Sequence, residues 1–261
     1  MVAPCLDAIK LPRSNRGQLR DFYIPVRSVS RPVWQALPRS EASVRVLGTF
    51  QRVIDLLVGD RVIALALPAA GNGPFHIVVE ALPTFEAREM TLKWVGEVLH
   101  LGRWRLDFDP SPTLWEPRPD WDALHLREDR LAEVRVLARE AARACEAPSP
   151  FAAWLLGAPM PQVAALERAL VRRDTMDLQE AVAAIAGLGP GLTPSGDDFL
   201  AGMMVASRLV EDASRLNVPH VIFETAGPRT NRISRAFLRA ARDGEVDERW
   251  HRLLAALAGE D

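Results

Sequence analysis

Two adjacent carboxylates and two hydroxyls gather in a short glycine- and proline-rich stretch, residues 189–198, between two apolar segments. The stretch reads Gly-Pro-Gly-Leu-Thr-Pro-Ser-Gly-Asp-Asp. Glycine permits positive φ and lets backbone N–H groups approach a ligand, whereas proline fixes φ and stiffens the chain. We therefore expect a rigid loop that carries chemistry, beyond a simple connection between two elements.

The apolar residues that follow, 199–206, are compatible with a helix, so the loop should lead into a helix N-terminus. Ser195 is then the predicted N-cap, with Asp198 at the position of a capping-box acid. A helix N-terminus offers free N–H groups and the positive end of the macrodipole, which together favour a bound anion. We expect the donors to a small anionic substrate to come from Gly189, Gly191, Thr193, Ser195 and Gly196.

Asp197 and Asp198 are the candidate catalytic residues, because a carboxylate beside a bound anion can orient an amide, accept a proton or hold Mg²⁺. Mg²⁺ at either of them is the one cofactor that these residues suggest. The spacing of Gly191 and Gly196 imitates a P-loop, but Asp197 stands where that motif needs lysine, which excludes an ordinary Walker-type nucleotide site. A structural interpretation also stays open, in which the acids cap the first helical turn and the glycines end the preceding helix.

A second polar block, residues 230–234, reads Thr-Asn-Arg-Ile-Ser and precedes another helical pattern. Thr230 is predicted as the N-cap of that helix, on the general preference for hydroxyls at this position. In the functional interpretation, Asn231 or Arg229 faces the glycine-rich loop and completes an anion or amide site. Thr230, Asn231 and Ser234 therefore join the candidate binding residues.

The composition is that of an ordinary globular protein: 261 residues, 48% hydrophobic, 25% charged, with a formal net charge of −2. This balance gives no footprint for nucleic-acid binding. Cys5 and Cys145 show no metal or redox spacing, and the five histidines form no metal motif. No window is apolar enough to span a membrane and the amino terminus lacks a signal-peptide pattern, so we expect a cytoplasmic protein.

The hydrophobic pattern changes along the chain and predicts an α+β fold. Residues 1 to about 40 are broken by prolines and predicted as irregular, and short β-branched runs then predict an antiparallel sheet or barrel-like region of about four to seven strands. A proline-rich crossing at 109–121 is typical of a domain joint. We predict a β-rich domain at 1–122 and a helical domain at 123–261, with the glycine-rich loop facing the joint.

The elements follow from the local periodicity. The predicted strands are 44–48, 53–58, 61–65 and 76–80. The predicted helices are 127–146, 149–156, 161–172, 178–186, 195–216, 231–242 and 246–258. Residues 220–224 interrupt the helical pattern and are predicted as a short strand or buried coil.

The run 187–202, which begins Gly-Leu-Gly-Pro-Gly-Leu-Thr-Pro-Ser-Gly-Asp-Asp, resembles the signature of a bacterial family of uncharacterised domains that includes the AllH subunit of oxamate carbamoyltransferase. Residues 230–234, with Leu238, Ala241 and Gly244, are similar to the family's second block. The resemblance implies a subunit that works with FdrA-like and AllG-like partners in allantoin-type nitrogen catabolism. The implied reaction converts oxalurate and phosphate into oxamate and carbamoyl phosphate.

Three functions stay open at this point. The first is an enzyme subunit that binds a small anion at 187–198 and takes part in carbamoyl or related acyl transfer. The second is a non-catalytic assembly or regulatory subunit whose loop is a structural corner. The third is a nucleotide-dependent phosphotransferase with a non-Walker loop. A homo-oligomer is compatible with all three.

Overall fold

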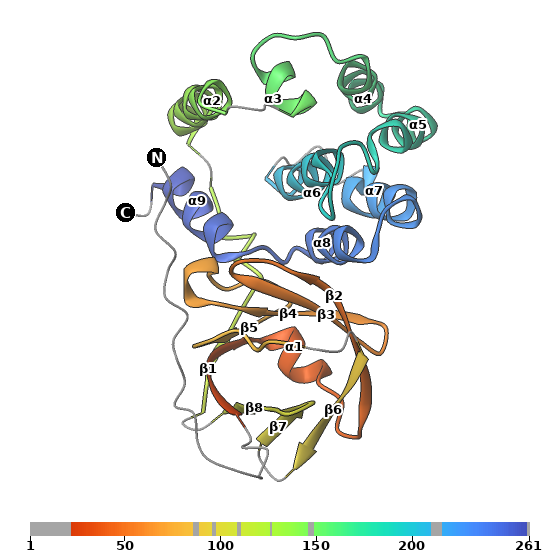
Figure 1. Cartoon of the computed structure of the whole chain (residues 1–261). Coiled ribbons are helices and arrows are strands. Elements are labelled where there is room, and N and C mark those ends of the chain that lie inside the picture. Colours follow the sequence, from red (N-terminus) through yellow and green to blue (C-terminus); the bar gives the residue numbers. More distant parts are fainter. Residues whose placement is uncertain are drawn as a thin grey trace, which may run out of the picture.

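The structure is a computed structural model that describes residues 22–85, 89–95, 98–108, 111–125, 127–145, 149–209 and 216–259. Over these residues the N-terminal half forms a β-barrel and the C-terminal half a layered group of helices, stacked one on the other (Figure 1). The prediction of an α+β fold, with a β-rich half followed by a helical half, is confirmed.

Among the described residues, eight strands close into a barrel in the order β5-β4-β3-β2-β6-β7-β8-β1, because β1 also pairs with β5. A further short strand, β9, lies beside β1. The barrel-like prediction is confirmed, but the purely antiparallel one is wrong, since β1 runs parallel to β8 and β9 and β4 runs parallel to β5. A parallel pair needs a longer crossing than a tight hairpin, and residues 67–75 provide it between β4 and β5. The strands are β1 Phe22–Ser30, β2 Ala42–Thr49, β3 Val53–Val58, β4 Arg61–Ala66, β5 His76–Val79, β6 Glu89–Val95, β7 Val98–Leu101, β8 Trp104–Asp107 and β9 Thr113–Trp115.

The prediction of an irregular segment up to about residue 40 is wrong for its described part. Residues 22–36 form β1 and a short helix, α1 (Arg31–Ala36), while residues 1–21 lie outside the described residues. The prolines occupy positions that regular structure tolerates. Pro25 lies where β1 stops pairing with β8 and begins to pair with β5, and Pro32 lies in the first turn of α1.

The β3–β4 hairpin shows how the sequence builds the barrel. Gly59 adopts a φ of +61° in the tight turn between the strands, a backbone conformation that favours glycine. Along β3, Ile54 and Leu56 belong to the barrel core, so the intervening Asp55 lies on the opposite face of the strand. Because Asp55 is buried, other elements must cover this outer face of β3.

The C-terminal half holds eight helices within the described residues: α2 Glu128–Arg143, α3 Pro150–Leu155, α4 Pro161–Arg172, α5 Thr175–Ile185, α6 Ser195–Ser207, α7 Val218–Ala226, α8 Arg232–Asp243 and α9 Glu248–Ala258. The predicted helix 195–216 ends at Ser207, and residues 210–215 lie outside the described residues. In the described part of the chain, no helix combines the length and apolarity that a membrane crossing requires.

The predicted strand or coil at 220–224 is wrong, because these residues belong to α7. Their β-branched side chains favour a strand by propensity alone. In the structure Val221 and Ile222 are buried in the core that the helices share, and Pro219 stands in the first turn, where proline starts a helix readily. Burial of one helical face therefore outweighs the local propensity.

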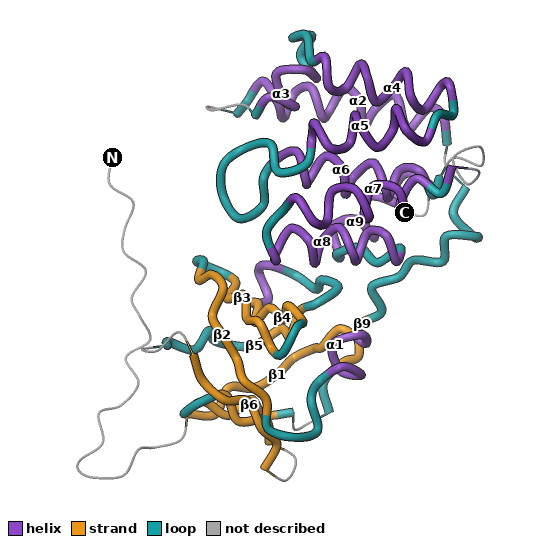
Figure 2. Tube along the Cα trace, turned by 90° about the vertical axis from the view of Figure 1, so that its right-hand side faces the viewer, coloured by secondary structure: helices purple, strands orange, loops and turns teal. Residues whose placement is uncertain are grey.

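Each half has its own hydrophobic core, and contacts at the joint hold the halves together. The helices nearest to the barrel are α8 and α9 (Figures 1 and 2). Phe237 of α8 packs edge-on against Phe75 of the barrel, with ring centroids 4.7 Å apart. Asn72 donates two hydrogen bonds to the Glu248 carboxylate and accepts one from the Glu248 N–H, each of 3.0 Å. The division at 122/123 falls between β9 and α2 and stays a prediction.

Candidate functional site

The glycine-rich loop connects α5 to α6 and leads directly into a helix N-terminus, as the sequence predicts (Figure 2). Gly187, Gly189 and Gly191 adopt φ values of +73°, +117° and +92°. Side chains rarely tolerate these angles, so the three positions explain why the loop requires glycine. The loop therefore has a specific backbone conformation that these glycines allow. Its tip, from Gly189 to Thr193, is exposed.

The prediction of Ser195 as the N-cap is wrong by one residue. Ser195 is the first residue of α6, and Pro194 holds the N-cap position without a side-chain cap. The Pro194 carbonyl accepts from the N–H groups of Asp197 and Asp198, at 2.9 and 3.1 Å. The Ser195 hydroxyl donates to the Leu188 carbonyl at 3.4 Å, which turns it towards the loop interior.

Gly196 is packed against the end of α5. Its N–H donates to the Leu188 carbonyl at 2.8 Å, so this donor is already used within the protein. A Cβ added at Gly196 would lie 2.1 Å from the Ile185 carbonyl oxygen, far inside contact distance. The glycine therefore permits the close approach of α6 to the end of α5, a different task from donating to an anion.

Asp197 is a buried carboxylate, 2% exposed, that joins three parts of the chain. One oxygen accepts from the Gly187 N–H at 2.8 Å, and the other accepts a hydrogen bond from the Thr230 hydroxyl. The start of the loop, the first turn of α6 and the turn before α8 are thus connected by one side chain. We call this arrangement of Gly187, Asp197 and Thr230 the Asp197 clamp.

The second polar block holds the tip of the loop. Asn231, and not Thr230 as predicted, is the N-cap of α8, since its side-chain oxygen accepts from the N–H groups of Ile233 and Ser234. Its amide nitrogen donates to the Leu192 carbonyl at 2.8 Å, and the Ser234 hydroxyl donates to the same carbonyl at 3.2 Å. The prediction that Asn231 faces the loop is confirmed, whereas Arg229 donates to the Thr225 carbonyl.

Asp198 differs from its neighbour because its side chain is exposed. Partial desolvation raises the pKa of its carboxyl, and the adjacent Asp197 carboxylate raises it further. Among the candidate residues, Gly189, Gly191, Thr193 and Asp198 are exposed, whereas Ser195, Thr230 and Asn231 are only partly exposed. A magnesium ligand at Asp197 or Asp198 stays a prediction. The described residues contain no group of three or more histidine, cysteine or acidic side chains that could hold a metal ion.

Residues 185–261 match the family model for oxamate carbamoyltransferase subunit AllH. The resemblance to AllH is thus confirmed over this segment. Neither the curated proteins nor the solved structures gave a match. The AllH-matched segment contains α6 to α9 and every member of the Asp197 clamp, while the barrel and α2 to α4 lie outside it.

The AllH-matched segment meets the barrel at the tip of the loop. A Cβ added at Gly48 of β2 would lie 3.1 Å from the Leu192 side chain. Gly48 pairs with Asp55 of β3, so Asp55 lies on the same outer face of the barrel as this contact. Asp55 is 6% exposed, and burial raises the pKa of its carboxyl to about 6.

Asp55 was not among the residues predicted from the sequence as candidates. A usable signal exists, because it is the one charged residue in the apolar strand Val-Ile-Asp-Leu-Leu-Val. A buried polar group is more informative than a buried apolar one, since its burial costs free energy.

Because its carboxyl is buried, Asp55 should make the free energy of unfolding fall as the pH rises through the acid range. The pKa of its carboxyl is about 6 in the folded protein against an ordinary 3.8, so the folded state holds the proton more tightly. The stabilisation is complete below about pH 4 and is lost by about pH 6, a loss on the order of 3 kcal/mol. Urea denaturation at a series of pH values measures this change.

Asp55→Asn should reduce the fall in the free energy of unfolding between about pH 4 and pH 6. It should also raise the free energy of unfolding at about pH 7. Glu245 provides an internal reference, because burial raises the pKa of its carboxyl to about 7, with further contributions from Asp243 and Glu116. The contribution of Glu245 to the free energy of unfolding is lost as the pH approaches about 7. This loss should appear in both the wild type and Asp55→Asn. Identical profiles for the wild type and Asp55→Asn would contradict the prediction.

Proposed function

We propose that this chain is an AllH-type subunit of an oxamate carbamoyltransferase-type system and that it binds a small anionic substrate at the loop 187–198. The observation that carries the proposal is the match of residues 185–261, which begins at the last residue of α5 and includes the whole loop. The reaction would convert oxalurate and phosphate into oxamate and carbamoyl phosphate. FdrA-like and AllG-like subunits are the proposed partners.

The exposed tip of the loop is the proposed anion site. Its backbone from Gly189 to Thr193 and the Thr193 hydroxyl reach solvent at the positive end of the α6 dipole. Ser195 and Gly196 support this tip from inside, because their hydroxyl and N–H groups are bound to Leu188. Asn231 and Ser234 contribute in the same way by fixing the Leu192 carbonyl.

Asp198 is the proposed proton-transfer residue. In the reaction, a phosphate oxygen forms a bond to the ureido carbonyl carbon, the bond from that carbon to the oxamate nitrogen breaks, and this nitrogen takes up a proton. Partial burial and the neighbouring Asp197 raise the pKa of the Asp198 carboxyl, which makes it a better candidate to hold and supply that proton than an ordinary aspartate. Asp197 has both oxygens engaged in the clamp, so its proposed role is to position the loop.

The test is to co-express the chain with FdrA-like and AllG-like subunits and to measure carbamoyl phosphate formed from oxalurate and phosphate. We expect Asp198→Asn to lower turnover by about 100-fold or more while the complex still assembles. Asp177→Asn is the matched control, since Asp177 is an acid in the first turn of α5, outside the loop. Equal turnover in wild type and Asp198→Asn would remove the proposed role of Asp198.

A non-catalytic assembly subunit is the second candidate function. The internal bonding of Ser195, Gly196 and Asp197 favours it, because these groups also make a self-sufficient structural corner. A thermal-shift titration with phosphate, carbamoyl phosphate, oxamate and oxalurate, each with and without Mg²⁺, separates the two. A ligand that binds the folded loop should raise Tm by mass action, whereas an assembly corner should give no shift with any of them.

A further inference from the structure

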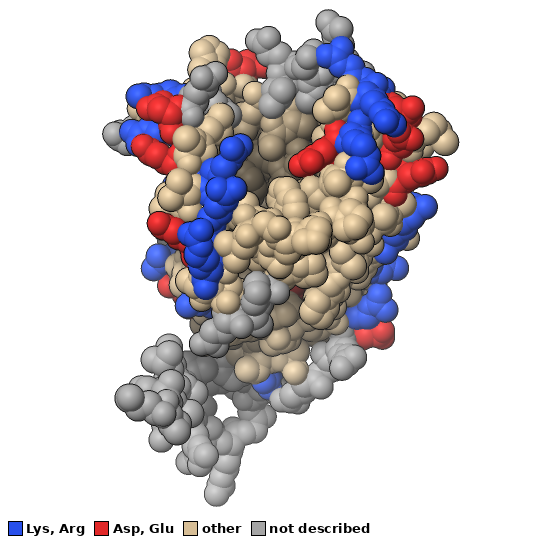
Figure 3. Space-filling model, turned by 90° about the horizontal axis from the view of Figure 1, so that it is seen from above, with Lys and Arg blue, Asp and Glu red and all other residues tan. Residues whose placement is uncertain are grey.

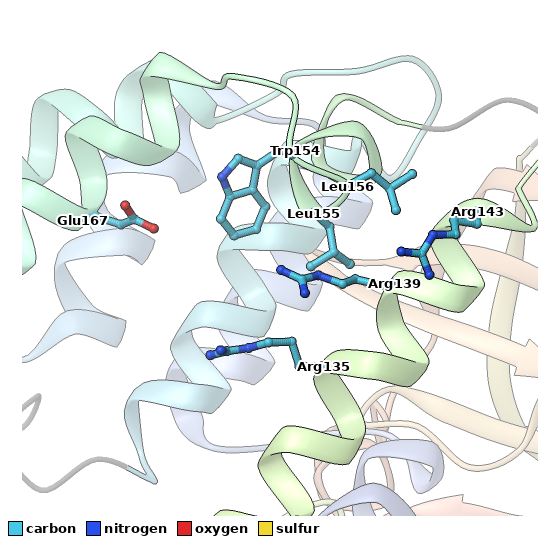
Figure 4. Close-up of a pocket in the computed structure, with 8 residues that line it drawn as sticks. Arg135, Arg139, Arg143, Trp154, Leu155, Leu156 and Glu167 are labelled. Atoms are coloured by element: carbon cyan, nitrogen blue, oxygen red, sulfur yellow. The ribbon is translucent and has the colours of Figure 1, made fainter.

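A cavity of about 570 Å³ lies among α2, α3 and α4, all of them outside the AllH-matched segment. Three arginines of α2 line one wall, Trp154 and Leu155 of α3 line the other, and Glu167 of α4 closes one end (Figure 4). Seen from above, the surface is hollowed and a row of Lys and Arg side chains follows one rim of the hollow (Figure 3). Positive charge is thus concentrated at the edge of a concave surface.

Arg135, Arg139 and Arg143 stand four residues apart and share one face of α2. A spacing of four residues corresponds to a rise of about 6 Å, so the three guanidinium groups form a column along the cavity. Figure 4 shows their side chains pointing away from α2 towards the wall that carries Trp154. A column of like charges on one helix face is unfavourable unless an opposite charge lies near.

Glu167 lies at one end of the cavity, but among the described residues it forms no ion pair with any of the three arginines. Arg130, on the same helix, pairs with Glu133 at 3.1 Å, and Arg127 pairs with Asp129 at 2.8 Å. Among the described residues, Arg135, Arg139 and Arg143 take part in no ion pair or hydrogen bond with another side chain. The column therefore presents three charge-assisted donors to whatever occupies the cavity.

The cavity wall opposite the arginines is apolar, and aromatic side chains pack behind it. The Trp154 ring is half-buried and packs edge-on against Phe199, with centroids 6.0 Å apart, and Phe199 in turn stacks on Phe151 at 4.6 Å. These contacts hold the indole in place at the cavity wall. A supported indole beside an arginine column suits a ligand that has a flat ring and an anionic chain.

We propose that this cavity binds a nucleoside polyphosphate, with the phosphate chain along Arg135, Arg139 and Arg143 and the base against Trp154. The volume lies in the range of small-molecule sites, and a concave site suits a compact ligand better than an acidic protein segment. The site is separate from the glycine-rich loop, so the inference does not rest on the proposed function. Its occupant would bind as an effector or co-substrate of this subunit.

The experiment is calorimetric titration of the full chain with ATP in EDTA, alongside tripolyphosphate and adenosine. We expect ATP to bind most tightly, tripolyphosphate more weakly and adenosine not measurably. Arg139→Gln should weaken ATP binding about tenfold or more, since it removes charge-assisted hydrogen bonds. Trp154→Ala should weaken ATP about fivefold or more and leave tripolyphosphate unchanged.

Arg168→Gln is the matched control, because Arg168 is an exposed arginine of α4 that does not line the cavity. It should leave ATP binding unchanged. The arginine variants alter exposed side chains, so we expect them to keep the wild-type Tm and circular dichroism spectrum. No ATP binding, equal ATP binding by wild type and Arg135→Gln/Arg139→Gln, or binding of a poly-glutamate peptide in place of ATP would each overturn the proposal.

Discussion

Gly196→Ala is expected to destabilise the helical half by about 3 kcal/mol or more. The new Cβ would stand 2.1 Å from the Ile185 carbonyl oxygen, which belongs to backbone and cannot rotate away. Either α6 must move from the end of α5, or the hydrogen bond from the Gly196 N–H to the Leu188 carbonyl must break. Thermal unfolding should show a Tm lower by roughly 6–12 °C.

Gly202→Ala provides the matched control within the same helix. A Cβ at Gly202 meets only Trp250, at 4.0 Å, so it fits without displacement. Alanine in a helix interior is favoured over glycine, and we expect a gain of about 0.5–1 kcal/mol. If the two variants shifted Tm in the same direction and by the same amount, the close packing of Gly196 would not be the cause.

Asp197→Ala is expected to cost about 3 kcal/mol, because it leaves the Gly187 N–H and the Thr230 hydroxyl without their shared acceptor. Asp197→Asn should cost only about 1 kcal/mol, since its amide oxygen can still accept from Gly187 and the Thr230 hydroxyl can reorient. Chemical denaturation of the two variants measures the difference. In the assembled complex, Asp197→Asn should retain more turnover than Asp197→Ala if the residue positions the loop.

A double-mutant cycle with Thr230→Val tests the clamp directly. The two groups share a hydrogen bond, so the cost of the Asp197→Ala/Thr230→Val double variant should be smaller than the sum of the single costs, by about 1 kcal/mol. Additive costs would show that Thr230 and Asp197 contribute independently. That result would contradict the clamp as the connection between the loop and α8.

The sequence predicted the α+β class, the barrel-like character and the loop at the start of a helix, because hydrophobic period and glycine spacing are local signals. It could not show that β1 closes the barrel, since the pairing of β1 with β5 depends on residues about fifty positions apart. The contacts of Asp197 were hidden for the same reason. Its partner Thr230 is 33 residues away, so the pattern around Asp197 indicated a ligand site, with a structural cap as the alternative, and gave no sign of this contact.

The errors at the helix starts have a common physical cause. Ser195 and Thr230 are good N-cap residues by type, but each hydroxyl has a tertiary partner, the Leu188 carbonyl for Ser195 and Asp197 for Thr230. The cap then moves by one residue, to Pro194 in one helix and to Asn231 in the other. The misplaced caps therefore coincide with the candidate site.

The shared core of the helical half has a consequence for how this protein can be divided. Leu178 and Val182 of α5 precede the AllH-matched segment, yet they belong to one core with Leu200, Met204 and Ile222. A fragment that starts at residue 185 would lose those partners and expose its own apolar face to water. The segment matched by the family model is therefore shorter than the segment that shares this hydrophobic core. A transplant of the signature into another protein would have to include α5.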